Sequence, residues 1–90
     1  MKKQELEKLR TEASSLLEHT IIVAKHGDIA NGKVYKFVDM ASIGMSDSRG
    51  EMRYDAYGKL VPIEDDTEYK IFSLWAIVHA INERLPIIML

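Results

Sequence analysis

The sequence predicts a small α+β fold, in which an N-terminal and a C-terminal helix cover an antiparallel sheet of two or three strands in the order α-β-β-(β)-α. Three observations favour this class. Apolar residues recur with a helical period near both ends, the middle is rich in β-branched and aromatic residues, and glycines separate the strand-like runs. Residues 1–90 are expected to form one domain, because a chain of this length buries one modest core.

The first helix is expected over residues 3–25. On a helical wheel its apolar residues fall on one side and its charged residues on the other. The apolar side consists of Leu6, Leu9, Ala13, Leu16, Leu17, Ile21, Val23 and Ala24. His26 and Gly27 then supply a C-terminal cap. The β-branched stretch TIIVAK at 20–25, with Asn31-Gly32 after it, is also compatible with a strand that opens a hairpin. Between the two, the helix is preferred.

The middle of the chain has the composition of strands. KVYKFVDM (33–40) is rich in β-branched and aromatic residues, and EMRYDAY (51–57) alternates between apolar and polar positions. KLVPI (59–63) is a third short candidate, which Pro62 assigns to an edge because proline cannot donate to a ladder. The stretch ASIGMSDSRG (41–50) holds two glycines and three serines, and is expected to be a long loop.

The second helix is expected to begin after the acidic run EDDTE (64–68). Asp66 or Thr67 can cap its first turn, which explains the run better than a cation site does. Pro86 ends the helix near Arg84 or Leu85. Its core-facing arc consists of Ile71, Leu74, Trp75, Ile77, Val78, Ile81 and Leu85.

The opposite side of this helix carries the small residues Ser73, Ala76 and Ala80, which allow another backbone to approach closely. Phe72 lies outside the core-facing arc. Extension of the core is the preferred role for this side chain, and part of a partner-binding patch is the alternative.

The composition excludes several kinds of site. The chain has no cysteine, which excludes disulfides, thiolate metal sites and a cysteine nucleophile. The formal net charge of −2 gives no general attraction for nucleic acid or anionic lipid. The charged start MKKQELEKLR lacks the features of a secretory signal, and no apolar run reaches the ~18–20 residues of a membrane span. We expect a cytoplasmic protein with no membrane contact, and no motif predicts a cofactor.

One pair of residues has the spacing of a general base. His79 and Glu83 lie one helical turn apart, and a carboxylate can orient an imidazole for proton transfer. No nucleophile or second acid accompanies them, so a structural histidine is preferred and no enzymatic activity is predicted. His19, His26 and His79 could bind a metal only if the fold gathered them beside Asp28, and no short ligand spacing favours this.

Cations and aromatic residues alternate on the expected strands, which makes nucleic-acid binding the alternative function. Aromatic side chains on a sheet can stack unpaired bases when cations flank them. Acidic residues lie between these cations and dilute the positive field, so this function is not the leading one. The residues concerned are Lys33, Lys36, Arg49, Arg53 and Lys59, with Tyr35, Phe37, Tyr54 and Tyr57.

The leading hypothesis is a non-enzymatic regulator or inhibitor that occludes the surface of a partner protein. The tail after Pro86 is expected to be extended, and its four apolar side chains gain stability when they are buried. They could cover their own core or add to a sheet edge, their own or that of a second subunit, and a homodimer is favoured. The residues expected at an interface are Phe72, Ala76, Ala80, Ile87, Ile88, Met89 and Leu90, with Arg53, Tyr54 and Tyr57.

Overall fold

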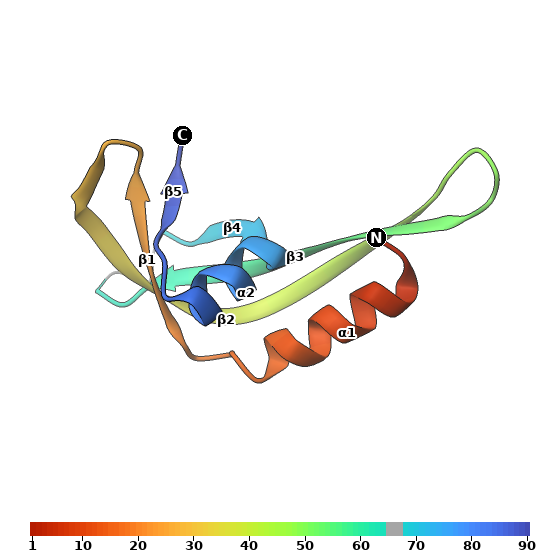
Figure 1. Cartoon of the computed structure of the whole chain (residues 1–90), viewed down its shortest axis with the longest axis horizontal. Helices are drawn as coiled ribbons and strands as arrows, with labels where there is room; N and C mark the ends of the chain where they lie inside the picture. Colours follow the sequence, from red (N-terminus) through yellow and green to blue (C-terminus); the bar gives the residue numbers. More distant parts are fainter. Residues whose placement is uncertain (65–67) are drawn as a thin grey trace.

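A computed structural model describes residues 1–64 and 68–90 of the chain. The elements are α1 (Lys3–Ser14), β1 (Thr20–Lys25), β2 (Asp28–Ser46), β3 (Met52–Pro62), β4 (Lys70–Ser73), α2 (Leu74–Glu83) and β5 (Ile87–Met89). The strands form one curled, open half-barrel, and both helices contribute to the core on its inner side (Figure 1). The hairpin of β2 and β3 projects from this body, and the molecule measures 46 Å along its longest axis and 26 Å along the other two.

The sheet has the strand order β4-β3-β2-β1-β5. Neighbouring strands are antiparallel, except that β5 runs parallel to β1. The registers place Ile21 opposite Tyr35, and Phe37 opposite Leu60. Side chains of directly opposed residues share one face of a sheet, so these four define the inner face. All four are buried.

Two irregularities of β2 bend the sheet. Opposite β3, the register advances from Phe37 to Asp39 while β3 moves by one residue, which makes Val38 the extra residue of a bulge. Opposite β1, the pairing passes from Val23–Lys33 directly to Lys25–Asp28. The stretch 29–32 of β2 therefore leaves the ladder with β1. Bulges of this kind increase the local twist and bend of a strand, which gives the sheet its curl.

The core joins the inner face of the sheet to both helices. One side of α1 contributes Leu6, Leu9 and Ala13, which are buried. From α2 the core takes Leu74, Ile77, Val78 and Ala80. The amide of Asn82 also donates a hydrogen bond of 2.9 Å to the carboxylate of Glu12 and so links the two helices.

Side chains of α2 pack directly over Gly58 of β3. A methyl group at this position would lie 3.0 Å from Cε1 of Phe37 and closer still to Cδ1 of Ile77. Only a glycine leaves room for the helix side chains here, because protein cores are close-packed. Gly58 is therefore the point at which α2 meets β3.

The expectation of a two- or three-stranded antiparallel sheet is wrong, because three further segments are strands. The first helix ends at Ser14 and not near 25, and TIIVAK is β1. Buried and exposed residues alternate over residues 20–23, and the β-branched side chains of TIIVAK suit a pleated surface. The alternative interpretation, a strand that opens a hairpin, is therefore correct. The hairpin turn lies at His26-Gly27 and not at Asn31-Gly32, and Gly27 has φ of 81°. This glycine serves the turn and not a helix cap.

The other two added strands come from the C-terminal third. Residues 70–73, expected as the first turn of the second helix, form β4 beside β3. The tail after Pro86 forms β5 on the edge of its own sheet. The tail was expected to be extended and able to join this edge, whereas a short run such as KIFS fits a strand as well as a helix, and the pairing available beside β3 decides between them.

The middle strands are longer than expected. Residues 41–46 are strand and not loop, and only the tip between Ser46 and Met52 lies outside the ladder. The expected strands 51–57 and 59–63 are one continuous β3, which has a neighbour on each side. Pro62 is nonetheless accommodated, because β4 pairs with β3 only as far as Leu60.

The second helix is shorter than expected and begins at Leu74. The expected caps Asp66 and Thr67 lie outside the described residues. The helix ends at Glu83, and Arg84 in the left-handed conformation follows, two residues before Pro86. Of the expected core arc, Leu74, Ile77 and Val78 are buried, whereas Ile71, Trp75 and Leu85 are exposed. Phe72 packs against the core, as preferred. No helix in the described part of the chain is long and apolar enough to cross a bilayer.

Adjacent residues at the start of α2 test this packing. We expect Leu74→Ala to lower the free energy of unfolding by about 2–5 kcal/mol, because it removes fully buried methyl groups beside Gly58. Trp75→Ala should cost much less, because more than half of this side chain is exposed. Urea denaturation of both variants measures the difference. Equal losses would show that α2 is rotated from the orientation described.

Candidate functional site

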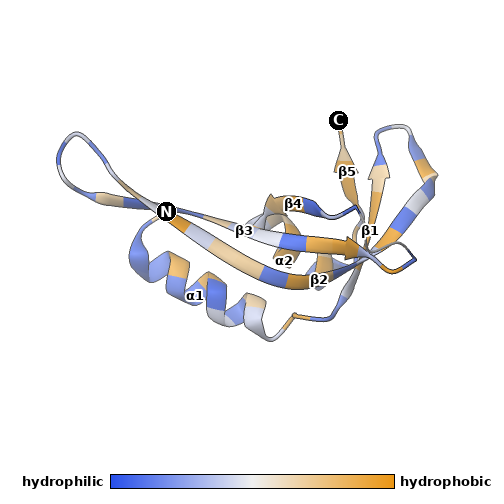
Figure 2. Ribbon diagram, turned by 180° about the vertical axis from the view of Figure 1, so that it is seen from behind, coloured by the Kyte–Doolittle hydropathy of each residue, from blue (hydrophilic) through white to orange (hydrophobic). Residues whose placement is uncertain are grey.

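A largely apolar groove lies beside β1. It has a volume of about 560 Å³, and residues of β1, β2, the end of α2 and the segment that leaves α2 line it. Four large apolar side chains line it and remain exposed: Ile22 (47%), Ile29 (60%), Val34 (44%) and Leu85 (50%). Figure 2 shows the hydrophobic colour on β1 and β5, whereas the outer surface of α1 is largely hydrophilic. We call this recess the β1 groove.

Strand alternation and one irregularity of β2 place these side chains. Ile21 and Ile22 both line the groove but point to opposite faces of the sheet, so the first is buried and the second is exposed. Val34 is the direct cross-strand partner of Ile22. Ile29 belongs to the stretch of β2 that leaves the ladder. Leu85 follows the left-handed Arg84, and its backbone N–H bonds to the carbonyl of Ala80 at 3.0 Å.

A glycine allows the close contact on which the groove wall depends. A methyl group at Gly32 would lie 2.7 Å from Cγ2 of Ile22 and 3.2 Å from Cβ of Ala24. Any other residue would displace the side chain of Ile22 from its position beside Val34. The Asn31-Gly32 pair is therefore part of the groove wall and not of a turn.

The groove runs along an open part of the sheet edge. The ladder between β1 and β5 begins at Val23, so Thr20–Ile22 pair with β2 on one side and have no strand on the other side among the described residues. Backbone groups of such an edge can pair with an added strand. Apolar walls and an open strand edge together suit an extended polypeptide segment.

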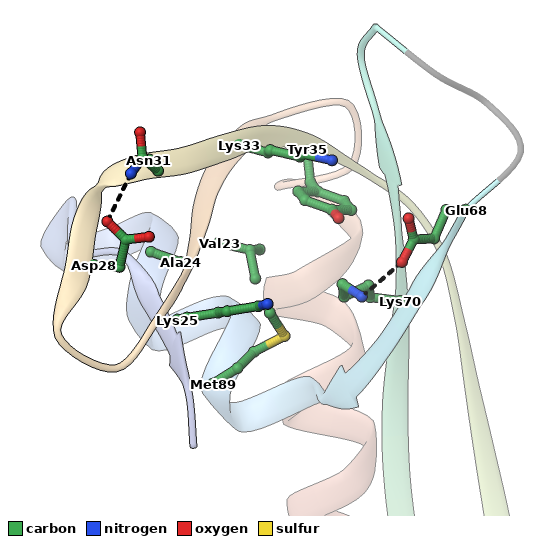
Figure 3. A pocket seen from close by; sticks show the side chains of 10 residues that line it. All are labelled: Val23, Ala24, Lys25, Asp28, Asn31, Lys33, Tyr35, Glu68, Lys70 and Met89. Atoms are coloured by element: carbon green, nitrogen blue, oxygen red, sulfur yellow. Dashed lines mark hydrogen bonds and ion pairs between the residues drawn. The ribbon is translucent and has the colours of Figure 1, made fainter.

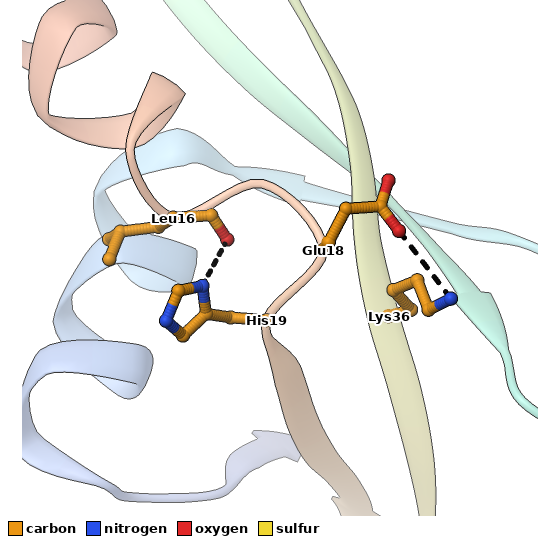
Figure 4. A network of polar contacts seen from close by, with 4 residues as sticks. All are labelled: Leu16, Glu18, His19 and Lys36. Atoms are coloured by element: carbon orange, nitrogen blue, oxygen red, sulfur yellow. Dashed lines mark hydrogen bonds and ion pairs between the residues drawn. The ribbon is translucent and has the colours of Figure 1, made fainter.

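The rim of the groove carries positive or neutral polar groups. His19 and Arg84 line it, and no acidic residue of the described chain does. The turn from α1 into β1 positions His19: its Nδ1 lies 3.0 Å from the carbonyl oxygen of Leu16, while Glu18 faces away and forms an ion pair of 3.4 Å with Lys36 (Figure 4). The rim therefore favours a segment with acidic flanks.

The structure does not bring the expected interface residues together. Ala80 and Ile87 are buried, Met89 is half-buried, and Ile88 and Leu90 are exposed at the C-terminal edge. Ala76 is exposed on α2, away from the tail. Of the ten expected residues, only Ala80 lines the β1 groove. The exposed isoleucines of β1 and β2 were missed because residues 20–25 were assigned to a helix; strand alternation within TIIVAK was the signal that identifies Ile22.

Of the remaining four expected residues, Phe72 packs against the core, and Arg53, Tyr54 and Tyr57 lie on the projecting hairpin. We call residues 41–57 the arm. Arg53 is exposed there beside Ile43, Met45 and Met52, all large and exposed. Tyr54 is half-buried, and its backbone N–H and carbonyl bond to Met1 at 2.9 and 2.8 Å. Tyr57 is half-buried opposite Ala41.

The aromatic residues expected to stack bases are divided between the two faces of the sheet. Tyr35 and Phe37 are buried on the inner face. On the outer face, Lys59 comes two residues after Tyr57, and its Nζ lies 4.6 Å from the centre of the Tyr69 ring. This outer pair of tyrosines is a smaller platform than the sequence pattern indicated.

His79 and Glu83, the two residues with the spacing of a general base, are both exposed on α2. No group of three or more potential metal-binding side chains is found within residues 1–64 and 68–90. Comparisons of the chain with protein-family models, curated proteins and solved structures gave no match. The functional inference therefore depends on the geometry of the surface.

Two neighbouring isoleucines test whether the groove side chains serve the fold. We expect Ile21→Ala to lower the free energy of unfolding by about 2–5 kcal/mol, because this side chain is buried. Ile22→Ala should cost less than about 1 kcal/mol, since it only reduces strand propensity and partial burial. Thermal and urea unfolding compare the two. A large loss for Ile22→Ala would assign the groove wall to stability and not to binding.

Proposed function

We propose that this protein is a non-enzymatic regulator that binds a partner protein and occludes the surface it covers. The observation that carries this proposal is the β1 groove, in which four exposed apolar side chains line one recess beside an open strand edge. Apolar groups held in water cost free energy, and a large exposed apolar patch commonly marks an interaction site.

The occupant that fits best is an extended, apolar segment of the partner with acidic flanks. Alternate side chains of such a segment would pack on Ile22, Val34 and Leu85, and its backbone would pair with Thr20–Ile22. Acidic flanks would meet His19 and Arg84 at the rim. A regulator of this kind acts by removing the bound segment from its other contacts, which requires no chemistry of its own.

A capture experiment tests this function. The tagged chain is incubated with nuclease-treated extract of its native cells, and retained proteins are identified by mass spectrometry. We expect wild type to retain a specific protein that the double variant Ile29→Ser, Leu85→Ser loses. Both positions are at least half exposed, so the variant should fold. Circular dichroism melts verify this.

The matched control is Ile43→Ser, Met45→Ser, which removes similar apolar area from the arm. It should retain the partner. The groove assignment would be contradicted if both double variants lost the partner equally. It would also be contradicted if wild type and both double variants retained the same proteins. Retention of nucleic acid when nuclease is omitted, with no protein specific to the groove, would favour the alternative function on the outer face with Tyr57, Tyr69 and Lys59.

A homodimer would have to form through a different surface from the one expected, which was the C-terminal tail. The tail is already paired with β1 of its own chain, so it does not need a second subunit to be covered. A second copy could instead occupy the β1 groove. Light scattering would then give twice the monomer mass for wild type and the monomer mass for the groove double variant.

A further inference from the structure

A ring of lysines lies at the end of the half-barrel opposite the arm. On three strands a lysine lies two residues from a buried or half-buried apolar residue of the inner face. Lys25 comes two residues after Val23 on β1, Lys33 two residues before Tyr35 on β2, and Lys70 two residues before Phe72 on β4. Inner positions of a small barrel are normally filled by apolar side chains. Three lysines that line one recess of the half-barrel are therefore a departure that needs an explanation.

These lysines line one cavity of about 390 Å³. Figure 3 shows Lys25 on one side and Lys70, beside Glu68, on the other, with the ring of Tyr35 above them in this view. The curl of the sheet brings its two edges together here, because β4 supplies Lys70 and β5 supplies Met89. Val23 and Ala24, both buried, form an apolar wall. The volume lies in the range of small-molecule sites.

Among the described residues that line the cavity, lysines outnumber acidic residues by three to two. Glu68 forms an ion pair of 3.2 Å with Lys70. The carboxylate of Asp28 accepts a hydrogen bond of 2.8 Å from the amide of Asn31. The described lining thus has one positive charge more than it has negative charges, because Lys25 and Lys33 remain beside Asp28 once Lys70 is paired with Glu68. Like charges that converge repel each other, and a bound anion removes this repulsion.

We propose that this cavity binds a small organic phosphate, a phosphate monoester with an apolar body. Each lysine ammonium offers three donors and acts as a point charge for phosphate oxygens. Tyr35, whose ring is buried, holds its hydroxyl at the cavity and adds a further donor. The wall of Val23, Ala24 and Met89 would contact the apolar body. This site is separate from the β1 groove, since Tyr35 and Val34 point to opposite faces of β2.

Titration with phenyl phosphate and inorganic phosphate at constant ionic strength tests the proposal. Amide NMR spectra of the wild-type chain should show saturable shifts at Lys33, Tyr35 and Lys70. Phenyl phosphate should bind more tightly than inorganic phosphate. The double variant Lys25→Met, Lys33→Met keeps the apolar stems and removes two charges, so binding should weaken about tenfold or more.

Lys36→Met is the matched control, because Lys36 lies on the outer face of the same strand and pairs with Glu18. It should bind phenyl phosphate as wild type does. Shifts that stay linear with concentration, or equal weakening by the control, would indicate diffuse charge attraction and overturn the proposal. Equal affinity for the two phosphates would overturn the assignment of an organic ester.

Discussion

The packing of α2 onto the inner face of the sheet at Gly58 is the contact on which the rest of the structure depends. Leu74 and Ile77 are fully buried there, against Phe37 and Leu60 from the two central strands. A side chain at Gly58 would separate helix and strand at the centre of the core. In a small domain one such contact represents a large share of the net stability, because the total is only about 5–15 kcal/mol.

This packing also determines where the two candidate binding surfaces lie. The helix leaves the core at Glu83, and the left-handed Arg84 with Pro86 reverses the chain so that β5 runs parallel to β1. The reversal leaves Leu85 beside the outer face of β1, which forms one wall of the β1 groove. It also places Met89 at the end of the half-barrel, where it closes one side of the lysine-lined cavity.

The sequence predicted part of this structure, and the missed parts have physical reasons. The buried stripe of α2 was found because Leu74, Ile77 and Val78 have an unambiguous helical period. TIIVAK and KIFS were assigned to helices because short, largely apolar runs are compatible with both the helical period and the strand period of two residues. Only pairing with distant strands decides between helix and strand. Small and polar residues in 41–46 suggested a loop, whereas the ladder with β3 holds them as strand. Neither the groove nor the cavity was predicted, since each joins segments more than 40 residues apart that only the curl of the sheet brings together.

The central claim is that the β1 groove, and no other apolar surface of the molecule, contacts the partner. Methyl NMR of the isoleucine-labelled chain tests this directly, because isoleucines lie in the groove, on the arm and on β4. On addition of the captured partner, the methyl signals of Ile22 and Ile29 should shift or broaden, while those of Ile43 and Ile71 stay unchanged. Shifts at Ile43 or Ile71, with Ile22 and Ile29 unmoved, would contradict the account.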